Sequence, residues 1–311
     1  MITVLAGGVG AAKFLQGLVK IVDPSEVTVI VNTGDDVELH GLYISPDVDT
    51  VTYTLAGLAD ETRGWGLRDE TWECLAALKH LGHETWFNLG DRDMALHIHR
   101  TQRLRDGATL SEVAAEVASA LGVGCSILPM SDQRVETRIK TRDGDLGFQE
   151  YLVKRGAGDP VQAIEFAGID DARPADGVME AIEGAQGVVI APSNPLISIG
   201  PILAVKGIRE ALVGCRGPVV AISPIVGGKA IKGPAADMMQ SLGLEVSAYQ
   251  VAELYRGFLD AFILDYADAD SLGRVQGLGI KAIATDTIMT ALPQKMALAR
   301  SALRALGVES K

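Results

Sequence analysis

The chain has 311 residues, of which 48% are hydrophobic, and its formal net charge is −12. This length and apolar content suit one large α/β domain or two small ones and exclude a disordered chain. The acidic balance and the 5% aromatic content argue against a nucleic-acid partner, because nucleic acids are held by basic and stacking side chains.

The N-terminal pattern predicts a strand, a glycine-rich turn and a helix. Residues 2–6 are apolar enough to form a buried parallel strand, and a helix is expected from residue 11. Residues 27–33 are typical of a second strand. Two strands joined by a short helix form a right-handed βαβ unit. We therefore expect an α/β fold with a Rossmann-like, doubly wound and mostly parallel sheet, carrying a helical and small β insertion.

The middle of the chain has a different pattern. Residues 50–122 are typical of helices, and residues 123–170 of short strands and turns. No clear linker separates these segments from the rest. We therefore predict a single domain over 1–311, in which 50–170 is an inserted, mostly helical subdomain with short strands that covers the active site.

From residue 178 the alternation of strands and helices returns. The pattern predicts strands that begin near 187, 218, 261 and 281, and helices over 178–185, 202–214, 235–243 and 293–307. No apolar run reaches ~18 residues, so no membrane span is expected. The first residues lack the basic and apolar pattern of a signal peptide, which predicts a cytoplasmic protein.

The loops that end the predicted strands are the candidate ligand sites, because doubly wound sheets bind ligands there. Gly7, Gly8 and Gly10 follow the first strand, and Lys13 lies in the next helix. Backbone N–H groups in such a turn can cradle a phosphate, and Lys13 can neutralise it. The run is not a Walker A loop and lacks the third glycine of a dinucleotide fingerprint. A tight turn and a solvated lysine are the alternative interpretation.

Closely spaced carboxylates form the second group of candidates. They are the pairs Asp35 and Asp36, Asp47 and Asp49, and Asp91 and Asp93. Such carboxylates can hold Mg²⁺, which takes oxygen ligands and substrate phosphates and would link an acidic protein to an anionic ligand. The alternative, open above all for Asp36 and Asp47, is that these side chains cap helices or bind turn backbone.

Other reactive side chains carry weaker signals. No histidine has metal-ligand spacing, and His97 and His99 are interpreted as structural or peripheral. The three cysteines lie outside any CxxC spacing and are expected as reduced thiols, with a catalytic cysteine as the alternative. Ser193 and Ser223 end predicted strands without a sequence cue for a base, so a covalent nucleophile is not expected.

Several long segments together resemble one known family. They include LAGGVGAAKFLQGL, VNTGDDVELHGLYISPDVDTVTYTLAGL, NLGDRDMALHIHRTQRLRDG, IAPSNPLISIGPIL and ISPIVGGKAIKGPAADM. The chain resembles the CofD/FbiA family from about residue 2 to about residue 300. This family comprises the phospholactate or phosphoenolpyruvate-derived transferases of coenzyme F-420 biosynthesis. The block RGWGLRDETW is similar to the bacterial, FbiA branch in particular.

The resemblance implies an Mg²⁺-dependent transferase of a substituted phosphate group. The donor would be a guanosine diphosphate that carries a 2-phospholactyl or enolpyruvyl group on its terminal phosphate. The acceptor would be the terminal ribityl hydroxyl of the deazaflavin Fo, which attacks the distal phosphorus as GMP leaves. Which acyl group the donor carries, phospholactate, phosphoenolpyruvate or phosphoglycerate, stays open. The resemblance also implies a homodimer.

The resemblance also assigns roles to particular residues. Asp49, in the family's PD-hydrophobic-DT motif, would be catalytic and act at the metal or at the Fo hydroxyl, with Asp35 as a second metal candidate. Asn88 would contact Fo. The remaining substrate-binding residues would be Gly7, Gly8, Gly10 and Lys13 at the diphosphate, and Ser193 and Asn194 at the nucleotide or Fo.

Two other classes of protein share part of this pattern. One is a non-catalytic, nucleotide-sugar-binding regulatory protein of a related Rossmann-like family, against which the GWGLRDETW and LGDRD blocks argue. The other is an NAD-dependent oxidoreductase, against which the incomplete glycine fingerprint argues.

Overall fold

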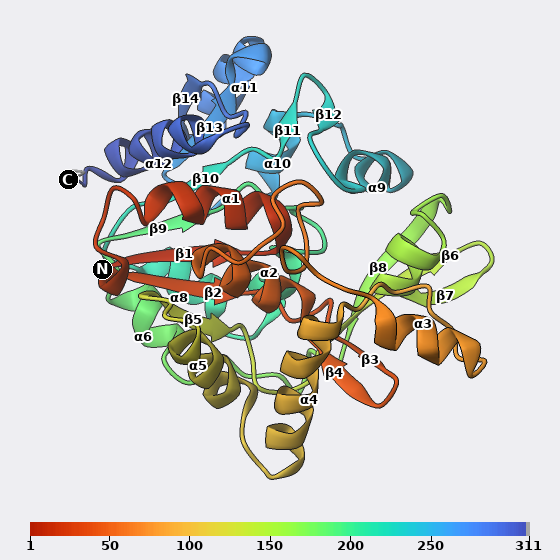
Figure 1. Ribbon diagram of the computed structural model, residues 1–311. Helices are drawn as coiled ribbons and strands as arrows, with labels where there is room; N and C mark the ends of the chain where they lie inside the picture. Colours follow the sequence, from red (N-terminus) through yellow and green to blue (C-terminus); the bar gives the residue numbers. More distant parts are fainter. Residues whose placement is uncertain (309–311) are drawn as a thin grey trace.

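The computed structural model describes residues 1–308 and has a seven-stranded parallel sheet at its centre (Figure 1). Across the sheet, the strands are β14 (Lys281–Thr285), β13 (Ala261–Asp265), β10 (Val219–Ile222), β9 (Gly187–Ile190), β1 (Ile2–Ala6), β2 (Val27–Val31) and β5 (Ser126–Pro129). Every adjacent pair is parallel. The predicted Rossmann-like, doubly wound α/β class is confirmed.

The strand order reverses beside β1. The chain first builds outward from β1 through β2 to β5, and then returns to place β9 on the other side of β1. Ile2 is therefore in register with Val27 on one side and Gly187 on the other. In a doubly wound sheet this reversal opens a crevice at the carboxyl ends of the two diverging strands, here β1 and β9.

Helices cover both faces of the sheet. One face carries α1 (Gly8–Leu18), α2 (Pro46–Leu55), α5 (Leu110–Ala120) and α12 (Leu292–Leu306). The other carries α6 (Val178–Glu183), α7 (Gly200–Ala204), α8 (Ile208–Gly214), α10 (Ala248–Leu254) and α11 (Leu272–Gln276). Because side chains alternate along a strand, Val4 enters the first core and Leu5 the second, and β1 is buried throughout.

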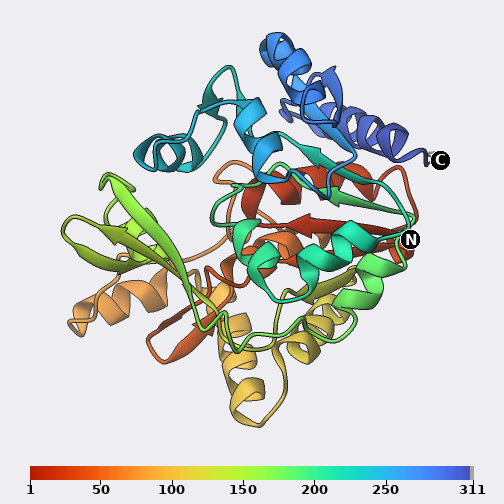
Figure 2. The ribbon, with the colours of Figure 1, turned by 180° about the vertical axis from the view of Figure 1, so that it is seen from behind.

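The remaining larger elements lie beyond the carboxyl ends of the central strands, on the side away from the N-terminus (Figures 1 and 2). They are β3 (Val37–Leu39), β4 (Leu42–Ile44), α3 (Glu73–His80), α4 (Asp91–Arg105), β6 (Glu136–Thr141), β7 (Gly144–Gly147), β8 (Val161–Ala167), β11 (Ile225–Val226), β12 (Lys229–Ala230) and α9 (Ala235–Ser241). Short helical turns complete the chain at η1 (Pro24–Glu26), η2 (Glu150–Lys154) and η3 (Tyr266–Ser271).

Two predictions from the sequence need correction. The stretch 50–170 is not one inserted block, because β5 lies within it and pairs with β2 in the central sheet, and α2 packs on α1. The helix predicted over 202–214 is broken, because Val205 is extended and Gly207 has a φ of 96°, so α7 and α8 are separate. The β3–β4 hairpin and α10 were not predicted.

Within residues 1–308, no helix combines the length and apolar character that crossing a membrane would require. The single domain predicted over 1–311, and the prediction that the stretch 50–170 covers the active site, stay predictions.

Candidate functional site

A cleft of about 690 Å³ lies at the carboxyl ends of the central strands. All residues to which the family resemblance gave a role line it: Gly7, Gly8, Gly10, Lys13, Asp35, Asp49, Asn88, Ser193 and Asn194. Of the other candidate carboxylates, Asp47 and Asp93 line it, whereas Asp36 and Asp91 do not. They come from loops after β1, β2 and β9, from α1 and α2, and from the segment before α4. The fold thus brings the candidates together, while their individual roles stay predictions.

The glycine-rich loop packs tightly against the loop after β9. The Ser193 hydroxyl donates to the carbonyl oxygen of Gly7 at 2.6 Å, and a Cβ on Gly10 would collide with the carbonyl oxygen of Pro192. Asn194 braces its own loop, because its Oδ1 accepts the Leu196 N–H at 2.9 Å. Gly7 is the N-cap of α1, and the first turn of a helix suits an anion. In the structure the Gly8 backbone N–H binds Asp47.

Two buried carboxyls, Asp35 and Asp47, line the cleft beside this loop. Asn32 donates to Asp47 Oδ2 at 2.9 Å and accepts the Gly34 N–H at 2.8 Å, which fixes both segments. Burial, and next the Asp47 charge, hold the pKa of Asp35 well above its usual value. Burial raises the pKa of Asp47 to about 6. Oδ1 of Asp35 has no hydrogen-bond partner within residues 1–308.

Asp36 lies outside the cleft lining and has a structural role. Its Oδ1 accepts the Ser45 hydroxyl at 2.7 Å, which ties the end of β2 to the start of α2. Burial raises its pKa to about 8. The sequence analysis left a capping or backbone role open for Asp36, whereas the bond that its carboxylate accepts comes from the side chain of Ser45.

Asp49 forms a buried ion pair with Arg100 of α4. Nη1 of Arg100 lies 3.1 Å from Asp49 Oδ2, and Nη2 contacts Oδ1. Burial raises the pKa of Asp49, while Arg100 opposes the shift. The carboxylate is thus oriented by a bidentate guanidinium.

His97 stands between Asp49 and Asp93, so of the two interpretations, structural or peripheral, its position contradicts the peripheral one and leaves the structural one open. It is 1% exposed and lines the cleft. Arg100 Nη1 lies 3.2 Å from His97 Nδ1. Because arginine can only donate a hydrogen bond, Nδ1 of His97 accepts this bond, which leaves the ring proton on Nε2. Nε2 faces Asp93 Oδ1 at 3.5 Å, and Tyr53 donates to the same oxygen at 2.6 Å. His99, two residues on, is exposed as its helical position predicts.

Two groups of side chains near the cleft are candidate metal sites, and they differ in whether their ligand atoms are free to bind an ion. Atoms of Asp49, Asp93 and His97 lie within 4.8 Å of one another, but the Arg100 guanidinium already occupies Asp49 and adjoins His97. Asp35 and Asp47 offer carboxylate oxygens at the cleft wall, and Oδ1 of Asp35 has no hydrogen-bond partner in the described part of the chain. Oxygen ligands of this kind suit Mg²⁺. The predicted metal ligands Asp35 and Asp49 therefore fall in two neighbouring groups.

Asp91 and Asp93 differ although they are neighbours in sequence. Asp91 caps α3, since it accepts the Cys74 N–H at 2.9 Å and the Thr71 hydroxyl at 2.6 Å. Asp93 lines the cleft.

Sequence reasoning missed Asn32, Arg100 and Lys232 as part of the site. Lys232 lies in a segment that carried the family resemblance, which was the available signal.

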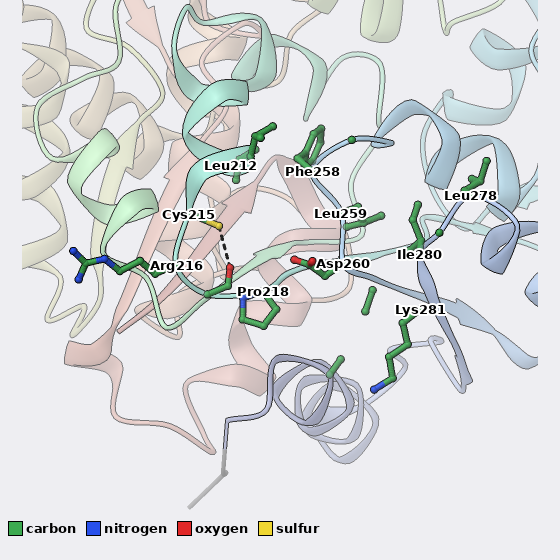
Figure 3. A pocket seen from close by; sticks show the side chains of 16 residues that line it. Leu212, Cys215, Arg216, Pro218, Phe258, Leu259, Asp260, Leu278, Ile280 and Lys281 are labelled. Atoms are coloured by element: carbon green, nitrogen blue, oxygen red, sulfur yellow. Dashed lines mark hydrogen bonds between the residues drawn. The ribbon is translucent and has the colours of Figure 1, made fainter.

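A second hollow, of about 700 Å³, lies at the opposite, amino ends of β10, β13 and β14 (Figure 3). Its acidic side chain, Asp260, accepts the Val219 N–H at 2.8 Å. Its Cys215 thiol donates to the Gly217 carbonyl at 3.0 Å, and burial followed by Asp260 raises the pKa of that thiol. Burial also raises the pKa of Cys125 to about 11. These surroundings disfavour thiolates, so they do not support the alternative of a catalytic cysteine.

The fold and the cleft define a doubly wound α/β protein whose switch-point cleft joins a glycine-rich loop to buried carboxylates, an arrangement that suits a phosphorylated ligand. The chain matches the family described as 2-phospho-L-lactate transferase CofD over residues 2–298, and it belongs to this family of transferases.

Curated relatives agree with this placement. A phosphoenolpyruvate transferase of Kitasatospora aureofaciens is 44% identical over 309 residues, covering 97% of this chain and 96% of the relative. A 2-phospho-L-lactate transferase of Methanococcoides burtonii is 40% identical, covering 93% and 94%. A crystal structure of a UPF0052-family protein from Bacillus halodurans has the same fold, with a TM-score of 0.65 at 18% identity over 97% of this chain and 98% of the other.

Proposed function

We propose that this protein transfers a 2-phospholactyl or enolpyruvyl-phosphate group from its guanosine diphosphate donor to the ribityl hydroxyl of Fo. The products are GMP and coenzyme F-420-0 or its dehydro form. The observation that carries the proposal is the single cleft that joins the glycine-rich loop, the buried carboxyls and Asn88. Relatives named for phosphoenolpyruvate and for 2-phospho-L-lactate support both donors.

The donor's phosphates would lie against the start of α1. There Gly8, Gly10 and Lys13 line the cleft, so backbone N–H groups and the Lys13 ammonium would bind the phosphate oxygens. Ser193 supports this end by holding Gly7 in place. Phosphoryl transfer needs positioning and charge neutralisation more than covalent participation by the protein. The proposed reaction therefore needs no serine or cysteine nucleophile.

The acceptor would occupy the part of the cleft walled by aromatic and polar side chains. Trp65, Phe87 and Phe148 line the cleft, as does Asn88, and aromatic side chains suit a flat deazaflavin ring. Asp49 would orient the attacking hydroxyl and accept its proton as the new phosphodiester bond forms and the bond to GMP breaks. Its raised pKa favours proton uptake, and Arg100 fixes its direction.

Mg²⁺ fits the carboxyl pair of Asp35 and Asp47, because Oδ1 of Asp35 lacks a partner within residues 1–308 and both side chains adjoin the phosphate loop. When bound, the ion would neutralise phosphate charge and stabilise the leaving group. Asp49 as a direct metal ligand remains the second possibility, and it requires Arg100 to release at least one carboxylate oxygen.

The first experiment is a titration of the purified protein with Fo, following deazaflavin fluorescence with and without GDP and Mg²⁺. The expected result is saturable binding that GDP and Mg²⁺ strengthen. Mass spectrometry with the phospholactyl, enolpyruvyl and phosphoglyceryl donors then identifies the group transferred. Failure of Fo to bind under every condition would overturn the proposal. Tight binding of a sugar nucleotide without turnover would favour the regulatory alternative.

We further propose that the protein is a cytoplasmic homodimer whose ligands are small molecules, with neither nucleic acid nor membrane as a partner. Static light scattering of the purified chain tests the dimer. A mass of one chain, 32.8 kDa, would contradict it.

A further inference from the structure

A second lysine, Lys232, faces the phosphate end of the cleft. It follows β12 and lines the same cleft as Lys13 and the glycine-rich loop. Its Nζ donates to the carbonyl oxygen of Arg63 at 3.1 Å. A Cβ on Gly64 would lie 2.6 Å from this Nζ and 3.5 Å from Cγ1 of Val9. The segment around Gly64 therefore passes directly over the glycine-rich loop, with Lys232 against it.

Lys13 and Lys232 are close enough to repel one another. Burial, and next the charge of Lys13, lower the pKa of Lys232. Within residues 1–308, neither ammonium forms a salt bridge with a carboxylate. Lys13 acts at longer range on Glu61, whose pKa it helps to lower. Two neighbouring cations that lack a salt bridge within the described residues are an arrangement that a bound anion would stabilise.

We propose that Lys232 binds the phosphates of the donor together with Lys13, and that it does so by exchanging the Arg63 carbonyl for a phosphate oxygen. The inference rests on the proposed function in that it takes the ligand to be a nucleoside diphosphate. A charged hydrogen bond to phosphate is stronger than one to a neutral carbonyl, so the exchange is favourable.

When Lys232 exchanges the Arg63 carbonyl for a phosphate oxygen, the contacts within the segment 60–72 would change. Nε of Arg63 donates to Asp60 Oδ2 at 2.8 Å, and its guanidinium lies 5.3 Å from the ring centre of Trp65 and 5.1 Å from that of Trp72. Trp65 itself lines the cleft. Release of the Arg63 carbonyl therefore changes the surroundings of an indole that can be observed by fluorescence.

The test is calorimetric titration of the full chain with inorganic pyrophosphate, GDP and guanosine. Lys232→Gln is expected to weaken pyrophosphate and GDP binding on the order of 10- to 100-fold and to leave guanosine binding unchanged. The matched control is Lys229→Gln, which removes an exposed lysine three residues away that does not line the cleft. It is expected to bind all three compounds as the parent chain does.

Two results would overturn the inference: Lys232→Gln that binds pyrophosphate like the parent, or Lys229→Gln that weakens it equally. So would failure of the parent chain to bind either pyrophosphate or GDP. A parent chain that binds both compounds but transfers nothing to Fo would refute the proposed function and leave the role of Lys232 standing. Pyrophosphate is also expected to change tryptophan emission in the parent chain, and to change it less in Trp65→Phe, where Trp72 is the remaining indole beside Arg63. An unchanged parent spectrum would exclude the exchange at Arg63.

Discussion

At the scale of single residues, the aspartates near the cleft differ because of what surrounds them. Asp49 has a guanidinium against both of its oxygens, whereas Asp36 is buried with a serine hydroxyl on one oxygen. Burial disfavours the charged form, and a nearby cation restores it. The result is a fixed carboxylate at Asp49 and a carboxyl whose pKa rises to about 8 at Asp36.

Asp49→Asn is expected to lower turnover at least ~100-fold, the scale for loss of one preorganised electrostatic group. The change also leaves Arg100 without its countercharge, so stability must be measured separately by thermal unfolding. Adding Arg100→Gln to Asp49→Asn removes both charges and should recover stability without recovering activity. Near-normal turnover in the folded single variant would remove Asp49 from the mechanism.

Asp36 predicts a pH dependence of stability. Its pKa rises from 3.8 to about 8 on folding, so between these values the folded protein keeps a proton that the unfolded chain releases. Its contribution to stability is therefore complete below about pH 4 and is lost as pH rises towards 8. The amide side chain of the Asp36→Asn variant cannot titrate. Between pH 4 and pH 8 the free energy of unfolding of this variant should therefore fall less than that of the parent chain, by an amount on the order of a few kcal/mol.

Urea unfolding between pH 4 and pH 8 measures this difference. Asp170→Asn, at an exposed position, is the matched control and should keep the slope of the parent chain. Equal slopes for Asp36→Asn and the parent would show that Asp36 does not retain its proton in the folded state.

At the scale of elements, the site depends on close backbone approaches. The loops after β1 and β9 touch at Gly10 and Pro192, and α1 crosses α12 at Gly17. A Cβ on Gly17 would collide with the backbone of Lys295 and lie 2.7 Å from the Met296 nitrogen. Backbone cannot move aside as a flexible side chain can. This contact therefore sets how closely α1 packs against α12.

Gly17→Ala is expected to destabilise the protein by about 1–3 kcal/mol, because the strain of overpacking exceeds the gain in helix propensity. Gly214→Ala in α8 is the control, since a Cβ there meets no atom within 4 Å, and it should change stability by less than about 0.5 kcal/mol. Denaturant midpoints of the two variants give the comparison. Equal effects would contradict the proposed close contact between α1 and α12.

At the scale of the whole molecule, the cleft joins segments that are far apart in the sequence. Gly7 and Ser193 meet because β9 returns beside β1, and Lys232 reaches Arg63 across 169 positions. A ligand in this cleft contacts loops from both halves of the sheet. The 40–46% identity to named transferases supports this family over the regulatory and oxidoreductase alternatives.

Ligand binding should therefore stabilise the entire chain. GDP with Mg²⁺ at 100 times its dissociation constant is expected to add about 2.7 kcal/mol to the free energy of unfolding. Chelation of Mg²⁺ by EDTA should remove most of this gain if Asp35 and Asp47 hold the ion beside the phosphates. Thermal unfolding with each addition measures it, and a gain from GDP that EDTA leaves intact would exclude the metal from the donor site.

The sequence by itself determined the class of fold, the glycine-rich loop and the strand-end loops whose residues line the cleft. These features depend on local patterns: apolar runs make strands, and glycine turns follow them at the edge where ligands bind. The family resemblance added Asn88, which no spacing rule would have singled out, and gave the catalytic role to Asp49.

Only the tertiary structure decided which charges meet. Arg100 reaches Asp49 from α4, 51 positions away, and Asp35 adjoins Asp47 rather than Asp49. The same reason placed β5 in the central sheet instead of in an inserted block. Such pairings depend on how strands are ordered and how loops converge at one edge of the sheet, and no local window of sequence contains that information.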